Sequence, residues 1–187
     1  KQVAEMLLSG EADIGVATEA LNQYPQLVTI PCYRWTHSII VPPHHPLLEV
    51  EGQVTLEQLV NYPIITYELG YTGRSHIDDA FAKVGLQPNV VLTAMDADVI
   101  KTYVKTGLGI GIVAEMAVQE VFPGGGSEGL TVIPLGHIFG QNVTRIAFKR
   151  GAYLPNFVYK FAELISPRLS KELITLAMHG DKDEFEL

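Results

Sequence analysis

The central part of the sequence alternates short apolar runs with segments that have a helical pattern. The apolar runs lie at Ile64–Tyr67, Val90–Thr93 and Ile110–Ala114. Between them, Ser75–Val84 and the segment that starts at Asp96 carry apolar residues at helical spacing. A chain that alternates strands and helices in this way folds as an α/β protein, because the helices cover the faces of a mostly parallel sheet. The sequence therefore predicts the α/β fold class.

Two segments are predicted to cross between subdomains. Leu27–Val41 is long and rich in β-branched and aromatic residues, and a strand of that length can pass from one subdomain to another. A second crossing is expected near His137–Asn142. Paired crossings make a hinge with a cleft between the subdomains. The sequence thus predicts one subdomain from residues 1–35 plus 137–187 and another from residues 36–136.

The two ends of the chain supply further elements. A helix is expected at Lys1–Leu8, followed by a buried, parallel strand at Asp13–Ala17. Thr55–Asn61 is predicted to be a short helix with its threonine as the cap. Helices are also expected at Asn156–Ile165 and Ser170–Met178, followed by an acidic tail.

Composition limits the kind of partner that this chain can bind. With 187 residues and 47% hydrophobic content, the chain can bury a core. Its formal net charge of -8 argues against direct contact of this segment with a nucleic-acid backbone. The single cysteine, Cys32, excludes an internal disulfide, and the sequence shows no signal peptide and no apolar run of membrane-spanning length. A cytoplasmic location is the expectation, although the sequence opens in a helical pattern without a methionine, as a truncated chain does.

The loop Thr72-Gly73-Arg74-Ser75, between a predicted strand and a predicted helix, has the composition of an anion site. The first N–H groups of a helix have no partner within the helix, and the helix dipole adds positive potential there. Ser75 and Asp78 resemble a capping box, which places the start of the helix at about Ser75. Arg74 either adds charge to the site, points to solvent or pairs with Asp78. The alternative is that Thr72 and Ser75 only cap the helix.

Two more residues are candidates for ligand contact. Thr18 follows a predicted strand, and open α/β sheets bind ligands at the carboxyl ends of their strands. Trp35 stands at the first predicted crossing, where its indole N–H can donate to a ligand. The alternatives are that Thr18 belongs to a turn and that Trp35 packs at the hinge. With Thr72, these residues are predicted to converge on one cleft.

The glycines of the segment "GLGIG", Gly107 to Gly111, suggest a dinucleotide-binding motif. That motif must follow a strand and open a helix. Here a predicted helix precedes the glycines and a predicted strand follows them. We interpret them as a helix C-terminus and as positions of close backbone packing.

Residue types associated with metals and catalysis do not form a recognisable set. His44 and His45 lie between prolines without carboxylate or cysteine partners at ligand spacing, and we expect them to face solvent. Cys32 is expected to be a structural thiol rather than a nucleophile. Asp96 and Asp98 are typical of a helix start rather than of an acid/base pair. We therefore predict no metal, no cofactor and no catalytic residue.

Several segments, in order and spacing, resemble the effector-binding domain of LysR-type transcriptional regulators: "LLSGEADIGVATEAL", "HPLLEVEGQVTLEQLVNYPIITY" and "KTGLGIGIVAEMAV". More narrowly, the chain is similar to the CysB and Cbl branch of that family, which controls sulfur assimilation and cysteine biosynthesis in bacteria. The segments that carry this similarity are "ATEAL", "PCYRW", "GYTGRS", "DADVIKTYVKTGLGIGIVA" and "HIF". The resemblance extends to about Ser170. The departures are "PGGGSEG", Glu115 and the divergent tail.

The resemblance implies two Rossmann-like subdomains, as in periplasmic binding proteins, with an anion site between them that accepts sulfate. Its inducers would be N-acetylserine or adenylyl sulfate. Thr18, Trp35 and Thr72 match ligand-contacting positions of the family. The remaining anion contacts and the DNA-binding winged helix-turn-helix would precede Lys1, and the whole protein would be a homodimer or homotetramer.

Two other classes of protein remain as alternatives. A periplasmic solute-binding protein for sulfate or a related oxyanion shares the two-lobed design, but it needs an export signal and has no DNA-binding domain. An enzyme acting on a sulfur or acyl-serine compound would need a nucleophile and a base, and the sequence offers no such pair.

Overall fold

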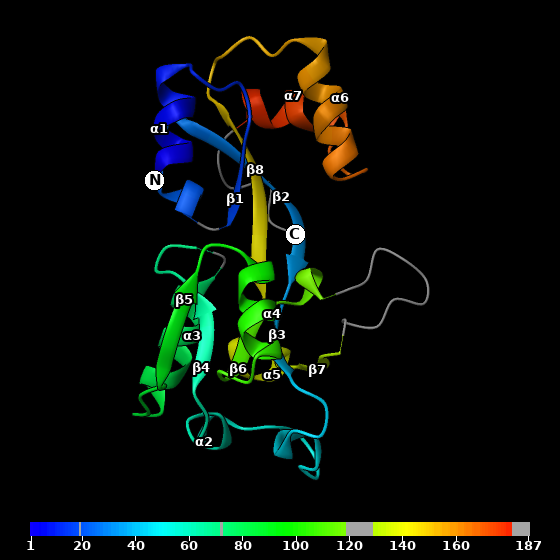
Figure 1. Ribbon diagram of the computed structural model, residues 1–187. Helices are drawn as coiled ribbons and strands as arrows, with labels where there is room; N and C mark the ends of the chain where they lie inside the picture. Colours follow the sequence, from blue (N-terminus) through cyan, green and yellow to red (C-terminus); the bar gives the residue numbers. More distant parts are fainter. Residues whose placement is uncertain (19, 72, 119–128, 181–187) are drawn as a thin grey trace. The chain divides into compact units, whose positions relative to one another are not determined.

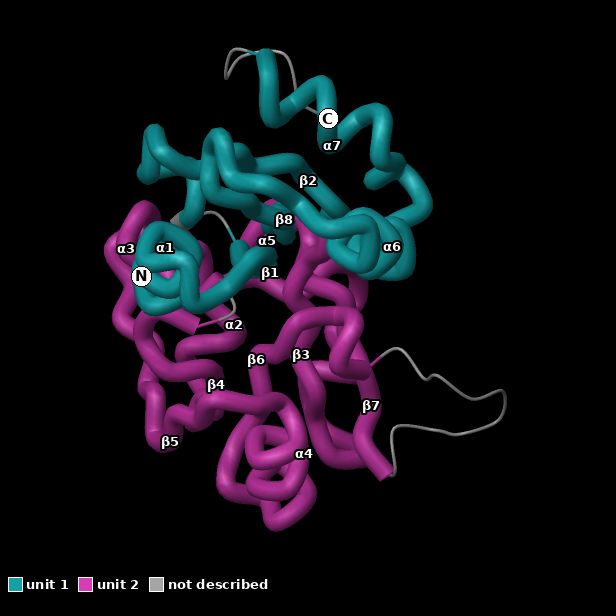
Figure 2. The backbone as a smooth tube through the Cα atoms, turned by 90° about the horizontal axis from the view of Figure 1, so that it is seen from above, with its two compact units in different colours: residues 1–34, 142–187 teal, residues 35–141 magenta. Residues whose placement is uncertain are grey.

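The computed structural model divides the chain into two compact units. The first comprises Lys1–Arg34 and Asn142–Leu187, and the second comprises Trp35–Gln141 (Figure 2). Both units are α/β, as predicted from the sequence. Trp35 and residues 137–141, which we expected in the first subdomain, lie in the second unit. The structure describes residues 1–18, 20–71, 73–118 and 129–180.

The second unit contains a five-stranded sheet (Figure 1). Its central strand β6 is parallel to β4, which is in turn parallel to β5, whereas β3 is antiparallel to β6 and to β7. The order of the strands across the sheet is β5 (Val90–Ala94), β4 (Ile64–Tyr67), β6 (Ile110–Ala114), β3 (His37–Val41) and β7 (Thr131–Pro134). The three strands predicted from apolar runs in the centre of the sequence are confirmed.

Both faces of this sheet are covered by helices. Ile110 and Ile112 of β6 belong to an apolar cluster that includes Ile77 of α3 (Arg74–Lys83). Val113, on the opposite face, belongs to a second cluster with Ile100 of α4 (Ala97–Lys105). Successive side chains of a strand point to opposite faces, so β6 needs apolar residues at every position. The short helices α2 (Leu56–Leu59) and α5 (Gly136–Phe139) contribute to the first cluster.

The glycines of "GLGIG" allow close packing around the start of β6. Gly107 follows α4 with a positive φ of 81°. A Cβ atom on Gly109 would lie 2.3 Å from the carbonyl oxygen of Pro63, and one on Gly111 would lie 2.6 Å from Cγ1 of Ile40. These contacts confirm the interpretation of this segment as a helix end followed by close backbone packing.

The first unit contains a three-stranded sheet in the order β1 (Gly15–Thr18), β8 (Asn142–Lys149) and β2 (Leu27–Trp35). β1 pairs with β8 in antiparallel register, with Gly15 opposite Ala147 and Thr18 opposite Thr144. The prediction that this strand is parallel was therefore wrong in the pairing that the structure describes. A short apolar run fits either direction, because the direction depends on the partner strand rather than on the run itself.

Helices lie on both faces of the smaller sheet (Figures 1 and 2). The helix α1 (Gln2–Ser9) packs on one face, where its Leu7 forms a cluster with Leu27 and Ala147. On the other face are α6 (Asn156–Ile165) and α7 (Lys171–His179), whose buried residues join Ile146 and Phe148 of β8. These helices confirm the three predicted near the two ends of the chain.

The long apolar segment forms two strands in different sheets. β2 ends at Trp35 and β3 begins at His37, so Thr36 alone separates them. This confirms that Leu27–Val41 passes from one unit to the other. Short 3-10 turns lie at Ala20–Gln23, Pro46–Leu48 and Glu115–Ala117.

Two predicted features fall partly or wholly beyond the described residues. The segment after Ala114, whose sequence also has a helical pattern, begins with a 3-10 turn at Glu115–Ala117 and continues beyond the described residues. Both "PGGGSEG" up to residue 128 and the acidic tail from residue 181 also lie outside. Among the helices that the structure describes, none is long and apolar enough to cross a membrane.

We expect Gly111→Ala to lower the free energy of unfolding by about 1–3 kcal/mol, because overpacking forces side chains out of their preferred rotamers. The new methyl group would meet Ile40, and also Cγ2 atoms of Ile100 and Val104 at 2.9 Å. Chemical denaturation measures the change. Gly136→Ala is the control, since its nearest atom is a methyl group of Thr36 at 3.1 Å. Equal stability of the two variants would contradict the packing argument.

Candidate functional site

The carboxyl ends of three parallel strands meet at one edge of the larger sheet. β4, β5 and β6 end there at Tyr67, Ala94 and Ala114. Because β3 is antiparallel to β6, it begins at this same edge, with His37 opposite Ala114. Trp35 and the loop that follows β4 are therefore brought to one edge of one unit. This is the edge at which open α/β sheets bind ligands.

Hydrogen bonds tie the strand ends together. The phenolic oxygen of Tyr67 accepts from the amide of Ala114 at 3.2 Å. The hydroxyl of Thr36 donates to Oε2 of Glu115 at 2.7 Å, and the amide of Glu115 donates to the carbonyl of Thr36 at 2.9 Å. This role of Tyr67, Thr36 and Glu115 was not predicted from the sequence. The one available signal was position: Tyr67 ends a predicted strand, Glu115 follows one, and Thr36 lies in the predicted crossing segment.

The helix α3 begins one residue earlier than predicted. Gly73 is its N-cap, in a left-handed conformation with φ 67°, and Arg74 is the first helical residue. The proposed capping box of Ser75 with Asp78 is wrong, because Ser75 lies inside the helix and is exposed. A positive φ favours glycine at the cap position, so no side-chain oxygen is needed there to define the turn.

The guanidinium group of Arg74 binds two partners within its own unit. Its Nε donates to Oδ1 of Asp78 at 2.8 Å, and its Nη1 donates to the carbonyl oxygen of Tyr67 at 2.6 Å. The side chain is only 10% exposed. Of the three roles considered for Arg74, pairing with Asp78 is confirmed. The guanidinium group thus fastens the first turn of α3 to the end of β4.

Backbone donors at the start of α3 are partly used as well. The amide of Arg74 donates to the carbonyl of Tyr71 at 2.9 Å, and that of His76 donates to the carbonyl of Gly73 at 3.0 Å. Binding of an anion by the amides of Gly73 and Ser75, on either side of Arg74, stays a prediction. Thr72 lies outside the described residues.

Carboxylates also lie near this edge. Burial raises the pKa of Tyr67, the hydrogen bond from Ala114 lowers it, and the negative charges of Asp96 and Asp98 raise it further. Asp96 caps α4, where its Oδ1 accepts from the amide of Val99 at 2.9 Å, which confirms its interpretation as a helix-start residue. These charges disfavour an anion at the start of α4.

Trp35 is buried, with 4% of its surface exposed. Its ring packs edge-on against His37 with centroids 5.1 Å apart, and His37 packs in the same way against Phe139 at 5.7 Å. This stack fixes the start of β3 against α5. Packing where the chain passes between units is therefore one role of Trp35, and contact with a ligand stays a prediction.

Thr18 is half-buried at the end of β1, opposite Thr144 of β8. It belongs to the first unit, whereas Trp35 and the residues Gly73 to Ser75 belong to the second. The structure thus brings the candidates of the second unit to one sheet edge. Convergence of Thr18 and Thr72 with them stays a prediction.

The other chemically reactive side chains have structural contacts. Cys32 is buried, and burial raises its pKa, so the thiolate is disfavoured. His44 is exposed, as expected, but His45 is half-buried: its Nδ1 accepts from the amide of Leu47 at 3.2 Å and its ring lies 4.6 Å from that of Tyr62. Within the described residues, His, Cys, Asp and Glu form no group of three that could hold a metal ion.

Comparison with known proteins assigns the family. The family model described as the LysR substrate binding domain matches residues 1–170. The chain belongs to this family. It is 50% identical over its whole length to the transcriptional regulator CysB of Burkholderia cenocepacia, and covers 58% of that protein. It is 48% identical to SsuR of the same organism, with 91% of this chain and 54% of SsuR covered.

The regulator cbl of Escherichia coli is 47% identical, with 98% of this chain and 57% of that protein covered. The chain thus spans little more than half the length of these relatives. Among solved structures, the cofactor-binding domain of the Cbl transcriptional regulator superposes with a TM-score of 0.85 at 46% identity, covering 96% of this chain and 77% of that chain. The LysR fold and the similarity to the CysB and Cbl branch, both predicted from sequence segments, are confirmed.

We expect Tyr67→Phe to lower the free energy of unfolding by about 1–3 kcal/mol, because the buried amide of Ala114 would lose its acceptor. Urea denaturation at neutral pH measures the loss. Tyr103→Phe is the matched control, since Tyr103 lies on the exposed side of α4. A loss of the same size in both variants would show that the hydrogen bond contributes little.

Proposed function

We propose that this chain is the effector-sensing domain of a LysR-type transcriptional regulator that controls genes of sulfur assimilation and cysteine biosynthesis. It binds sulfate, or a small inducer such as N-acetylserine or adenylyl sulfate. The observation that carries this proposal is the start of α3 at Gly73, at the carboxyl edge of a parallel sheet, in a chain 46–50% identical to proteins named CysB and Cbl.

The proposed ligand contacts are hydrogen-bond donors from Thr18, Trp35, Thr72, Gly73 and Ser75. Arg74 contributes by holding the loop in place, because its guanidinium group already binds Asp78 and the carbonyl of Tyr67. Neutral donors can hold a dianion without a salt bridge, since each hydrogen bond to a charged group contributes about 1.5–3 kcal/mol.

The whole protein, in this proposal, is a cytoplasmic homo-oligomer that binds DNA through a winged helix-turn-helix outside this chain. The net charge of -8 disfavours contact of this domain with the DNA backbone. In this proposal the domain therefore binds the ligand, and another domain binds DNA. The relatives are named as transcriptional regulators, which favours this function over a periplasmic oxyanion-binding protein and over an enzyme.

The test is calorimetric titration of the full-length gene product with sulfate, N-acetylserine and adenylyl sulfate. Thr72→Ala removes one donor to a charged ligand, so we expect the affinity to fall about 10- to 100-fold. The inducer that binds identifies the effector.

Thr106→Ala is the matched control for this titration. Thr106 lies at the far end of α4, where its hydroxyl donates to the carbonyl of Tyr103 at 2.8 Å. Its replacement should leave the affinity unchanged. If none of the three ligands binds, or if Thr72→Ala binds with unchanged affinity, the proposal of an anion site at this loop is wrong.

The same titration tests the choice of anion. A site made only of donors satisfies sulfate fully but cannot accept a hydrogen bond from the proton of hydrogen phosphate. We expect sulfate to bind at least about fivefold more tightly than phosphate at pH 6, because an unsatisfied donor in the site costs about 1–3 kcal/mol. Comparable affinities would mean that the site also contains an acceptor.

A further inference from the structure

The carboxyl edge of the larger sheet contains a topological switch point. The strands β4 and β6 are parallel neighbours, and both end at this edge. From β4 the chain continues to β5, on one side of this pair, whereas the next strand after β6 is β7, on the other side. Open α/β sheets bind ligands outside the carboxyl ends of such a pair. The loop before α3 and Glu115, which directly follows β6, flank this position.

Hydrogen bonds link the two sides of the switch point. The phenolic oxygen of Tyr67 accepts from the amide of Ala114 at 3.2 Å, and the carbonyl oxygen of Tyr67 accepts from Nη1 of Arg74 at 2.6 Å. Glu115 is the residue after Ala114, and Arg74 is the residue after the cap Gly73. Neighbouring strands lie about 4.8 Å apart. A small organic molecule bound at the start of α3 can therefore extend to the end of β6.

The carboxylate of Glu115 is oriented and can accept further hydrogen bonds. Its Oε2 accepts from the hydroxyl of Thr36 at 2.7 Å, and its backbone amide donates to the carbonyl of Thr36 at 2.9 Å. Both residues are half-buried. A carboxylate has about four acceptor sites, and Thr36 is the one donor to it among the described residues. Because Thr36 already orients the group, little side-chain freedom is lost when it accepts another bond.

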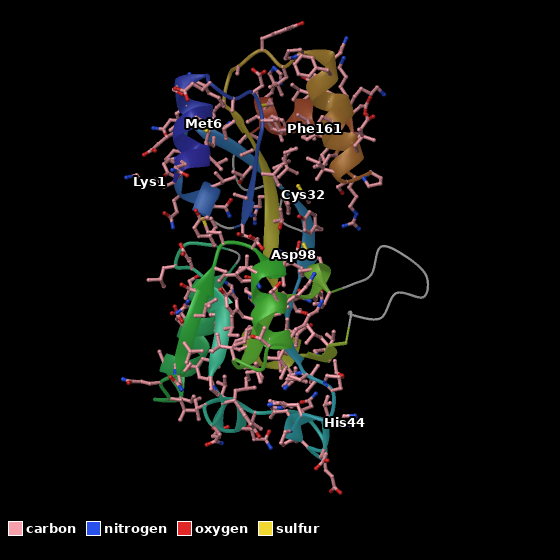
Figure 3. The ribbon with its side chains drawn as sticks, in the orientation of Figure 1. Lys1, Met6, Cys32, His44, Asp98 and Phe161 are labelled. Carbon is pink, nitrogen blue, oxygen red and sulfur yellow. The ribbon has the colours of Figure 1, made fainter. Side chains whose placement is uncertain are left out.

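The charges on the β6 side of the switch point are negative. Besides Glu115, Asp96 and Asp98 lie at the start of α4 (Figure 3 labels Asp98). Burial raises the pKa of Tyr67 and these two charges raise it further, so their field reaches the phenolic oxygen that binds the amide of Ala114. Negative charge attracts a hydrogen-bond donor and repels an anion. The start of α3 instead offers backbone N–H groups, so the two sides suit different parts of one ligand.

We propose that the carboxylate of Glu115 accepts a hydrogen bond from the effector, and that the effector is therefore an organic anion with a hydroxyl or N–H group. This inference rests on the proposed function, in which the anionic group of the effector binds at the start of α3. Glu115 binds the rest of the molecule, because a carboxylate repels the anionic group itself. Inorganic sulfate has no donor, whereas N-acetylserine and adenylyl sulfate both carry hydroxyl and N–H groups.

A purely structural role of Glu115 makes a different prediction. In that case the carboxylate only holds Thr36, and with it the adjacent Trp35, in place. Loss of the carboxylate would then weaken the binding of all ligands alike, and removal of the Thr36 hydroxyl would have the same effect. A direct contact weakens only the binding of ligands that carry a donor. A comparison of ligands as well as variants therefore distinguishes the two roles.

The test is calorimetric titration of the full-length gene product and its Glu115→Gln variant with N-acetylserine, adenylyl sulfate and sulfate. Glutamine has nearly the same shape as glutamate but no charge, and a hydrogen bond to a neutral acceptor is weaker than one to a carboxylate. We expect the affinity for the organic inducer to fall about 5- to 15-fold. The affinity for sulfate should stay within about twofold or rise, because a negative charge is removed.

Two control variants accompany this titration. Thr36→Val removes the hydroxyl that binds Glu115 but leaves the carboxylate, so we expect it to change the affinities by less than about threefold. Glu49→Gln makes the same substitution at an exposed residue beyond the other end of β3, and it should leave all affinities unchanged. Figure 3 shows the nearby His44 and Asp98 at opposite ends of the second unit.

The outcomes separate this inference from the proposed function. An equal loss of affinity for sulfate and the organic inducer in Glu115→Gln, the same loss in Thr36→Val, or no loss in Glu115→Gln overturns the inference. Weaker binding by Thr72→Ala would then still support the proposed function. If the unaltered protein binds sulfate but neither organic inducer, the effector needs no donor and the inference is wrong. If it binds none of the three ligands, the proposed function is wrong as well.

Discussion

Burial of β6 on both faces is the constraint on which the larger unit depends. Ile112 packs toward α3 and Val113 packs toward α4, so no polar side chain fits between the ends of this strand. The absence of a side chain at Gly111 lets Ile40, Ile100 and α4 come close to the sheet. Polar chemistry is thereby confined to the places where strands end.

The edge of the sheet shows how those ends are organised. Tyr67 joins β4 to β6 through the amide of Ala114, and Arg74 joins α3 to β4. Both contacts use polar groups to fix a loop rather than to bind a ligand. The consequence is that the first turn of α3 is held against the end of β4. In the proposed function, an anion at this loop is selected by hydrogen-bond geometry rather than by net charge.

Many elements could be predicted because their signals are local. The strand Ile64–Tyr67 and the helix Asn156–Ile165 have the predicted bounds, since apolar period and flanking turn residues define them. The cap of α3 could not be predicted in this way. Ser75 and Asp78 have the sequence pattern of a capping box, but Asp78 binds Arg74, which is also held by the carbonyl of Tyr67. The hydrogen bond from Arg74 to β4 therefore determines where α3 begins, rather than the capping-box pattern of Ser75 and Asp78.

By itself, the sequence determined the α/β class, most strands and helices, the passage of the chain between two units, and the family, because periodicity and motif segments are properties of neighbouring residues. Only the tertiary structure decided that β1 runs antiparallel to β8 and that the hydroxyl of Tyr67 accepts a hydrogen bond from the amide of Ala114. It also decided that the guanidinium group of Arg74 binds partners within its own unit. Some of these contacts join residues that lie far apart in the chain, and others involve a group that could bind any of several partners. Which contact forms depends on the partner that the packed sheet brings within hydrogen-bond distance.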